Sequence, residues 1–182
     1  MPPLLLRELK RKPNSWIEPR IWPPAPDLPA DRLVDLDTSS NKLSVFSCES
    51  EKLDKAKITV AAALIAKRNT VRDLDWVVIS LDDVKKAGYD IVLTPKSGNS
   101  ADADVNKGHF DIRNLTARAI LKLLEMLTPK LEPGELPRRE SVLSLSIAQE
   151  LKALEAEKGP NFVMTDDVRK SADEILGESP EG

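Results

Sequence analysis

The stretch "DADVNKGHFDIRNLT", residues 102–116, contains the single histidine of the chain, with three aspartates close to it in sequence. Carboxylates can orient an imidazole so that it acts as a general base, and together these groups can hold a metal ion. One hypothesis is therefore a hydrolase that uses His109 together with Asp102, Asp104 and Asp111.

The same stretch also has a structural interpretation, because "HFDIRNL" alternates apolar and polar residues as the start of a strand does. On a strand, Asp111 would share a face with His109, while Asp102 and Asp104 belong to a predicted polar loop at residues 96–108. The spacing matches no metal or acid–base motif. We therefore expect no metal or cofactor, and we expect His109→Asn or His109→Gln to leave the fold and function largely intact.

The segment "VDLDTSS" has the paired aspartates, Asp35 and Asp37, of some phosphatases and of calcium-binding loops. The phosphatase pattern needs Thr or Val where Ser39 stands. The calcium loop needs Gly where Ser40 stands and Glu where Phe46 stands. We interpret both aspartates as outward residues of a strand that enters a turn.

Cys48 is the only cysteine, so no disulfide can form within the chain, and a Cys–His zinc site would need additional carboxylates. Its place just before a predicted helix would suit a nucleophile, but a free cysteine is more often a small buried hydrophobic residue. Neither a glycine-rich phosphate loop nor the elbow of a serine hydrolase occurs in the sequence.

Residues 1–30 contain eight of the fourteen prolines and read as a proline-rich basic arm. Its apolar anchors either contact a partner or fold back onto the domain. If they bind a partner, deletion of residues 1–28 should leave the stability of the remaining domain nearly unchanged. The candidate partner-binding residues are Trp16, Ile17, Arg20, Ile21 and Trp22.

The first twenty residues also carry an excess of positive charge, which leaves weak nucleic-acid binding as an alternative. The net charge of −3 argues against this alternative, because nucleic-acid binding usually calls for a basic domain or stripe. The cations concerned are Arg7, Lys10, Arg11, Lys12 and Arg20.

Residues 31–128 carry the signals of an α+β core domain in the order β-β-α-β-α-β-α. The pattern predicts a small mixed or antiparallel sheet of about four to five strands with helices packed on one face. Ser50, Ser80, Thr116 and Thr165 are predicted helix caps, and Gly88 and Gly177 are predicted helix ends. The residues expected to be fully buried are Leu64, Val78, Ile91 and Leu124.

The remainder of the chain divides into a linker at 129–139, a C-terminal helical segment at 140–176 and a loose tail at 177–182. Leu143, Ile147, Leu151 and Leu154 align along the first C-terminal helix and predict its apolar face.

The composition, with 41% hydrophobic and 31% charged residues, predicts one soluble domain with appendages. No run of residues suits an export signal or a membrane span, so a cytoplasmic protein is expected. We expect a non-catalytic accessory protein that binds a protein partner through its arm, its C-terminal helices or both. Self-association stays open, as do the hydrolase and nucleic-acid alternatives.

Overall fold

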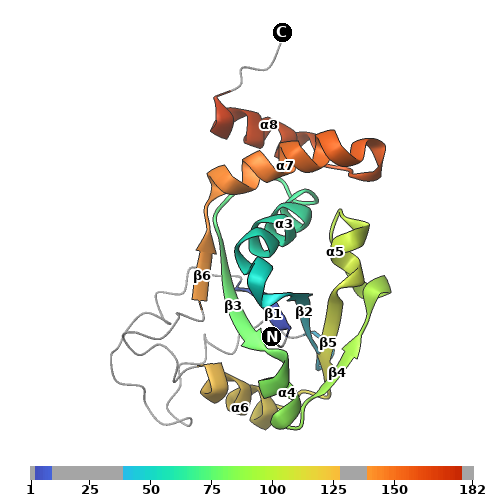
Figure 1. The fold of residues 1–182 in the computed structure, drawn as a ribbon, viewed down its shortest axis with the longest axis vertical. Helices are drawn as coiled ribbons and strands as arrows, with labels where there is room; N and C mark the ends of the chain where they lie inside the picture. Colours follow the sequence, from blue (N-terminus) through green and yellow to red (C-terminus); the bar gives the residue numbers. More distant parts are fainter. Residues whose placement is uncertain (1–2, 10–38, 128–138, 178–182) are drawn as a thin grey trace, which may run out of the picture.

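A computed structural model of the chain describes residues 3–9, 39–127 and 139–177. Six strands form one sheet in the order β4-β5-β2-β1-β3-β6, and every neighbouring pair is antiparallel (Figure 1). The strands are β1 (Leu4–Leu9), β2 (Leu43–Cys48), β3 (Leu74–Ser80), β4 (Asp90–Leu93), β5 (His109–Arg113) and β6 (Arg139–Val142).

In the described residues, six α-helices connect or follow these strands. Three of the four predicted capping residues are confirmed, whereas Ser50 lies in a 3-10 turn and does not cap the helix that begins at Leu53. Ser80, Thr116 and Thr165 each accept a hydrogen bond from a main-chain N–H three residues ahead, and Gly177 ends the last helix with a φ of 72°. The helices are α3 (Leu53–Ile65), α4 (Leu81–Lys86), α5 (Ala103–Lys107), α6 (Ala117–Leu127), α7 (Ser144–Lys158) and α8 (Asp166–Leu176). Short 3-10 turns lie at Ser50–Lys52, Pro95–Ser97 and Gly159–Asn161.

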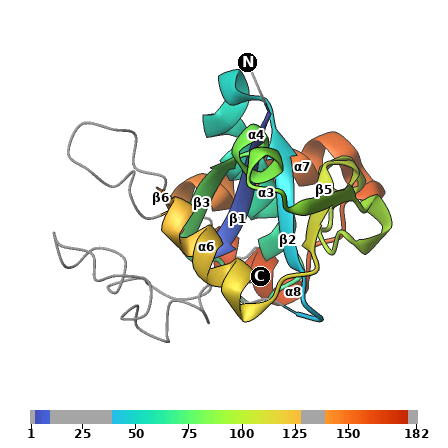
Figure 2. The same ribbon diagram turned by 90° about the horizontal axis from the view of Figure 1, so that it is seen from below.

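The two faces of the sheet bury two separate apolar clusters. Leu6 and Trp76 pack with α3, α7 and α8, whereas Leu5 and Val77 pack with α4 and α6. Figure 1 shows α3, α7 and α8 on one side of the strands, and Figure 2 shows α4 and α6 from the opposite side. The predicted α+β class with an antiparallel sheet is confirmed, but helices cover both faces of the sheet rather than one.

Strand β1 was not predicted, because the sequence analysis placed residues 4–9 in the arm. It lies between β2 and β3, where Leu6 is opposite Phe46 on one side and Val78 on the other. Leu5 and Leu6 are both 0% exposed, since consecutive residues of a central strand point to opposite faces. Deletion of residues 1–28 would therefore remove a central strand, so it cannot test partner binding as we expected.

The position of β1 also defines how the proline-rich segment is attached. Strands β1 and β2 are antiparallel neighbours, so the end of β1 at Leu9 and the start of β2 at Leu43 lie at the same end of the sheet. The side chain of Glu8 accepts two hydrogen bonds from Arg68, at 2.8 and 2.5 Å, which tie this end of β1 to the segment after α3. Residues 10–38 are thus joined to the sheet at both ends.

Several other expectations differ from the structure in detail. Strand β6 begins at Arg139, the last residue of the predicted linker, and α5 lies within residues 96–108, which were predicted to be a loop. Leu64, Val78 and Ile91 are only partly buried, and the side chain of Leu124 lies outside the described residues. The predicted strand "RLVDLD", residues 32–37, and most of the arm also lie outside them.

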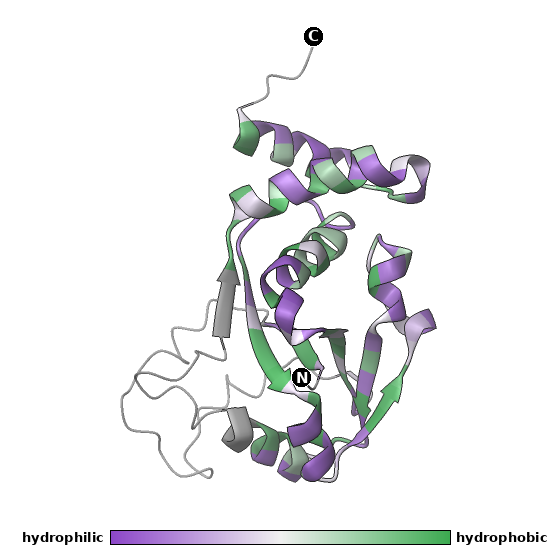
Figure 3. Ribbon diagram, viewed as in Figure 1, coloured by the Kyte–Doolittle hydropathy of each residue, from purple (hydrophilic) through white to green (hydrophobic). Residues whose placement is uncertain are grey.

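The distribution of hydropathy follows this architecture. Strand β3 is hydrophobic along most of its length, whereas the outermost helix, α8, is mostly hydrophilic (Figure 3). Among the described residues, no helix combines the length and the apolar character needed to cross a membrane.

The central position of β1 predicts a large effect of Leu6→Ala on stability. Truncation of a fully buried leucine creates a cavity and should lower the free energy of unfolding by about 2–5 kcal/mol, measured by denaturant titration. Leu93→Ala, on the edge strand β4 where Leu93 is 51% exposed, is the matched control and should have a much smaller effect. Equal, near-zero effects of the two substitutions would contradict a central β1.

Candidate functional site

His109 is a buried residue of the sheet, with 2% of its surface exposed. Its Nδ1 lies 2.9 Å from the hydroxyl oxygen of Thr94 and 3.0 Å from the main-chain carbonyl of Thr94. The ring of Phe46 packs edge-on against the imidazole, with 5.1 Å between the ring centroids. These contacts fix the imidazole in the interior, as they would for a structural histidine.

Asp111 lies on β5 two residues beyond His109 and is also buried. Its carboxylate accepts a hydrogen bond of 3.2 Å from the hydroxyl of Ser44 on the neighbouring strand β2. No hydrogen bond joins His109 to Asp111 among the described residues. Their spacing on the strand is as predicted, but each side chain has a different structural partner.

Asp102 and Asp104 form a second, separate group around Lys158. Asp102 caps α5 by accepting a hydrogen bond of 2.8 Å from the N–H of Asp104. Lys158 Nζ, at the end of α7, lies 2.6 Å from the Asp102 carboxylate and 3.0 Å from that of Asp104. The four residues of the hydrolase hypothesis are thus divided between two sets of structural contacts.

The charges in this second group shift the pKa values of Asp104 and Lys158. The hydrogen bonds from Lys107 and Lys158 lower the pKa of Asp104 to about 2. Partial burial acts to lower the pKa of Lys158, but its hydrogen bonds to Asp102 and Asp104 outweigh that effect and raise the pKa. Lys158 and Asp104 therefore stay oppositely charged through the neutral range.

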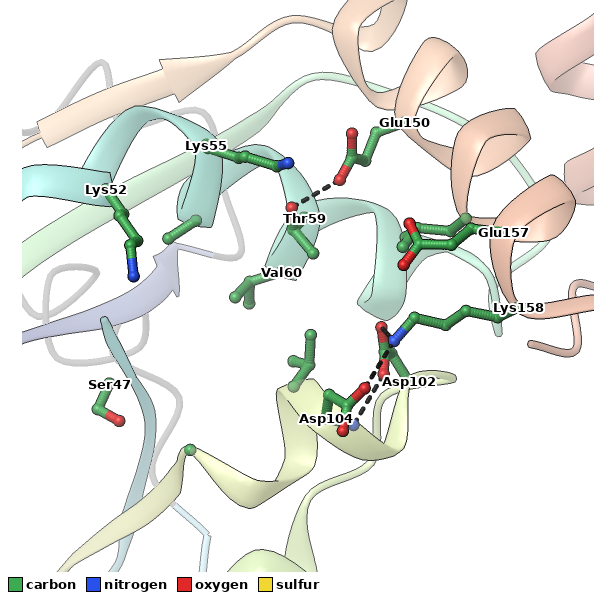
Figure 4. Close-up of a pocket in the computed structure, with 14 residues that line it drawn as sticks. Ser47, Lys52, Lys55, Thr59, Val60, Asp102, Asp104, Glu150, Glu157 and Lys158 are labelled. Carbon is green, nitrogen blue, oxygen red and sulfur yellow. Dashed lines mark hydrogen bonds and ion pairs between the residues drawn. The ribbon is translucent and has the colours of Figure 1, made fainter. Parts of the chain in front are cut away.

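A pocket of about 370 Å³ lies beside this ion-pair group, between β2, α3, α5 and α7 (Figure 4). Its lining contains positively and negatively charged side chains, two hydroxyl groups and four apolar side chains. The polar side chains are Ser47, Lys52, Lys55, Thr59, Asp102, Asp104, Glu150, Glu157 and Lys158, and the apolar ones are Ala56, Val60, Val105 and Leu154.

The polar contacts in this pocket connect helices and do not form a catalytic set. The Thr59 hydroxyl donates a hydrogen bond of 2.6 Å to the Glu150 carboxylate and so links α3 to α7. Lys52 is paired with the exposed Glu49 outside the lining. No imidazole is among the residues that line the pocket, so neither hydroxyl is paired there with a histidine base.

Cys48 lies at the end of β2 and is partly buried. Burial raises the pKa of its thiol to about 11, although the charge of Lys57 acts in the opposite direction. The thiol is therefore protonated at neutral pH, which supports the structural interpretation. In the part of the chain that the structure describes, no three His, Cys, Asp or Glu side chains gather closely enough to hold a metal ion.

The predicted partner-binding residues Trp16, Ile17, Arg20, Ile21 and Trp22 lie outside the described residues, as do Asp35 and Asp37 and the cations Lys10, Arg11 and Lys12. Arg7, which we considered for nucleic-acid contact, belongs to β1 and donates a hydrogen bond of 2.9 Å to the main-chain oxygen of Ser44.

Sequence reasoning missed two exposed apolar residues at the junction of β6 and α7. Leu143 is 60% exposed and Leu145 is 49% exposed, whereas Ile147 and Leu151 further along α7 are buried. We had placed Leu143 on the buried face of this helix. The structure places it at the N-cap, outside the helical repeat, so its side chain does not follow that face.

Comparisons of the chain with models of protein families, with curated proteins and with solved structures found no match. The functional argument therefore rests on the residues of this chain alone.

The Lys158 ion pairs predict a pH-dependent contribution to stability. Lys158→Gln removes a charged partner from the buried Asp102 and should lower the free energy of unfolding at pH 7 by about 1–3 kcal/mol. The pKa of Asp104 is lowered from its ordinary value of 3.8 to about 2 in the folded protein. The contribution of Asp104 to stability is therefore fully present above pH 3.8 and disappears as the pH falls towards 2. Denaturant titrations between pH 2 and pH 7 should show that the difference in free energy of unfolding between Lys158→Gln and the unaltered protein becomes smaller as the pH falls.

Lys52→Gln is the control for this series, since it removes an exposed pair that contributes little. A pH-independent difference between Lys158→Gln and the unaltered protein would contradict the ion-pair assignment.

The burial of His109 changes the expectation for its replacement. His109→Gln should lower the free energy of unfolding by about 1–3 kcal/mol, because the buried hydroxyl and main-chain carbonyl of Thr94 lose their hydrogen-bonding contact with the imidazole. Partner binding measured below the melting temperature should be unchanged. Unaltered stability combined with lost function would instead support the hydrolase hypothesis.

Proposed function

We propose that this chain is a non-catalytic accessory protein that binds a protein partner through residues 10–38 and the start of the C-terminal helices. The expected cytoplasmic location is part of this proposal. The structural roles of the side chains that could do chemistry support it: His109 contacts Thr94, Asp102 caps a helix and pairs with Lys158, and the Cys48 thiol is protonated.

The observation that carries the proposal is the attachment of residues 10–38 to two neighbouring strands of the sheet. A segment held at both ends loses less entropy on binding than a free tail, and its prolines restrict it further. Trp16 and Trp22 are the large apolar side chains of this segment. Aromatic residues of this kind contribute most of the binding energy in many protein interfaces.

The exposed leucines lie near the point where this segment leaves the sheet. Leu9 is opposite Asp75 on β3, and the preceding residue of β3, Leu74, is opposite Val142 on β6. Neighbouring strands are about 4.8 Å apart, so the end of β1 lies roughly 10 Å from the β6 position that precedes Leu143. A partner that contacts residues 10–38 can therefore reach Leu143 and Leu145 as well.

The test replaces Trp16 and Trp22 by Ala in the full-length chain, which keeps β1 intact. The tagged double variant and the unaltered protein are purified from the native host, and proteins bound in stoichiometric amounts are identified by mass spectrometry. We expect the variant to lose a stoichiometric partner while its melting temperature changes by no more than a degree or two. Leu93→Ala, on the opposite edge of the sheet, is the control and should keep the partner.

Two outcomes would contradict the proposal. If the double variant melts several degrees lower and aggregates, the tryptophans cover the protein's own core. If it keeps the same partner at the same stoichiometry, residues 10–38 do not form the binding surface.

A further inference from the structure

A second pocket, of about 430 Å³, lies where β4 begins, β5 ends and α6 starts, whereas the ion-pair group lies at α5, which precedes the start of β5, and at the end of α7. Three cations line it: Arg113 from the end of β5, and Arg118 and Lys122 from α6. The single carboxylate in the lining belongs to Asp90, and it accepts a hydrogen bond of 3.1 Å from Asn114. The lining therefore has two more positive charges than negative ones.

These cations make no ion pair with any described residue, although the protein as a whole has a net charge of −3. Arg118 and Lys122 are four residues apart on α6, so their side chains are neighbours and repel each other. Arg118 also lies in the first turn of this helix, where the helix dipole disfavours a cation. The Nε of Arg113 is buried without a hydrogen-bond partner.

The repulsion between Arg118 and Lys122 and the position of Arg118 in the first turn both cost stability, and one bound anion in the pocket would offset both. The start of α6 lines the pocket and adds to this attraction, because the first main-chain N–H groups of a helix have no acceptor within it and the Thr116 hydroxyl caps that of Ala119. Arginine guanidinium groups match the oxygens of a phosphate in pairs. A phosphate monoester carries a charge of about −1.5 to −2 at neutral pH, close to the excess positive charge of the lining.

We propose that the pocket formed by Arg113, Arg118 and Lys122 at the start of α6 binds a phosphate monoester. The aromatic ring of Tyr89 forms part of the wall, and its hydroxyl is held by a hydrogen bond of 2.8 Å to the carbonyl of Ala119. The volume of the pocket exceeds that of one phosphate group, so part of the esterified molecule enters with it. This site does not depend on the partner surface described above.

The test is an NMR titration of the full-length protein at constant ionic strength, with inorganic phosphate as the first probe and chloride as the reference. We expect saturable shifts of the Ala117 and Arg118 amides with phosphate only. Arg118→Gln combined with Lys122→Gln should weaken the phosphate affinity at least tenfold. Both side chains are exposed, so the variant should fold, and in the absence of phosphate it should melt no lower than the unaltered protein.

Lys85→Gln combined with Lys86→Gln is the control, since these cations of α4 are exposed and lie outside the lining. The control should bind phosphate as the unaltered protein does. Shifts that do not saturate, or that persist unchanged in the Arg118/Lys122 variant, would overturn the proposal.

A second titration distinguishes the two sources of such a group. A short peptide with phosphoserine is compared with the same peptide containing serine. If the phosphopeptide binds at least tenfold more tightly than inorganic phosphate and the serine peptide does not bind, the ligand is a phosphorylated protein segment. If the phosphopeptide binds no more tightly than phosphate, the ligand is a small phosphorylated molecule.

Discussion

The pairing of β1 with both β2 and β3 is the constraint on which the remainder of the structure depends. Two fully buried leucines, Leu5 and Leu6, point from this one strand into the two apolar clusters. Without β1, the strands β4, β5 and β2 would be separated from β3 and β6. The helices on each face would then lose the surface against which they pack. A strand near the N-terminus thus completes a sheet whose other strands come from the following residues.

The buried polar side chains also restrict how the elements of the fold pack. His109, Asp111, Thr94 and Ser100 are buried, and each has a hydrogen-bond partner from another part of the fold or from the adjoining turn. A buried polar group costs free energy unless it is paired, so these contacts restrict how the strand β5 and its neighbouring turns can pack. Lys158 restricts the packing of α7 in the same way, because its ion pairs with Asp102 and Asp104 hold the end of that helix next to α5. Residue types that suggest chemistry in the sequence therefore stabilise the structure.

Much of the fold could be predicted because local signals and tertiary packing agree. The helix at Leu53–Ile65 and the strand at Leu74–Ser80 follow the predicted order of elements, and the caps at Ser80, Thr116 and Thr165 mark helix starts correctly. Strand β1 could not be recognised in the same way, since the surrounding prolines and cations are typical of an arm. The run Leu4–Leu6 was the available signal, because a strand buried on both faces has consecutive apolar residues.

The sites were less predictable than the fold. Burial of His109 depends on how β5 pairs with β2 and β4, which a single sequence does not reveal. The cationic pocket combines Arg113 with Arg118 and Lys122 only because β5 ends beside α6, and none of the three stood out in the sequence. Strand β6 was divided between the predicted linker and the predicted C-terminal helical segment, since "RESV" is short and mostly polar and obtains its structure from pairing with β3.

Hydrogen exchange of the β1 amides tests the central claim most directly. A central strand opens only with the whole sheet, so its hydrogen-bonded amides should exchange as slowly as those in the middle of β3, at a rate set by global unfolding. Native-state exchange followed by NMR or mass spectrometry measures both strands in the same sample. Exchange of residues 4–9 within seconds, while β3 stays protected, would show that these residues belong to an arm and would contradict the fold described above.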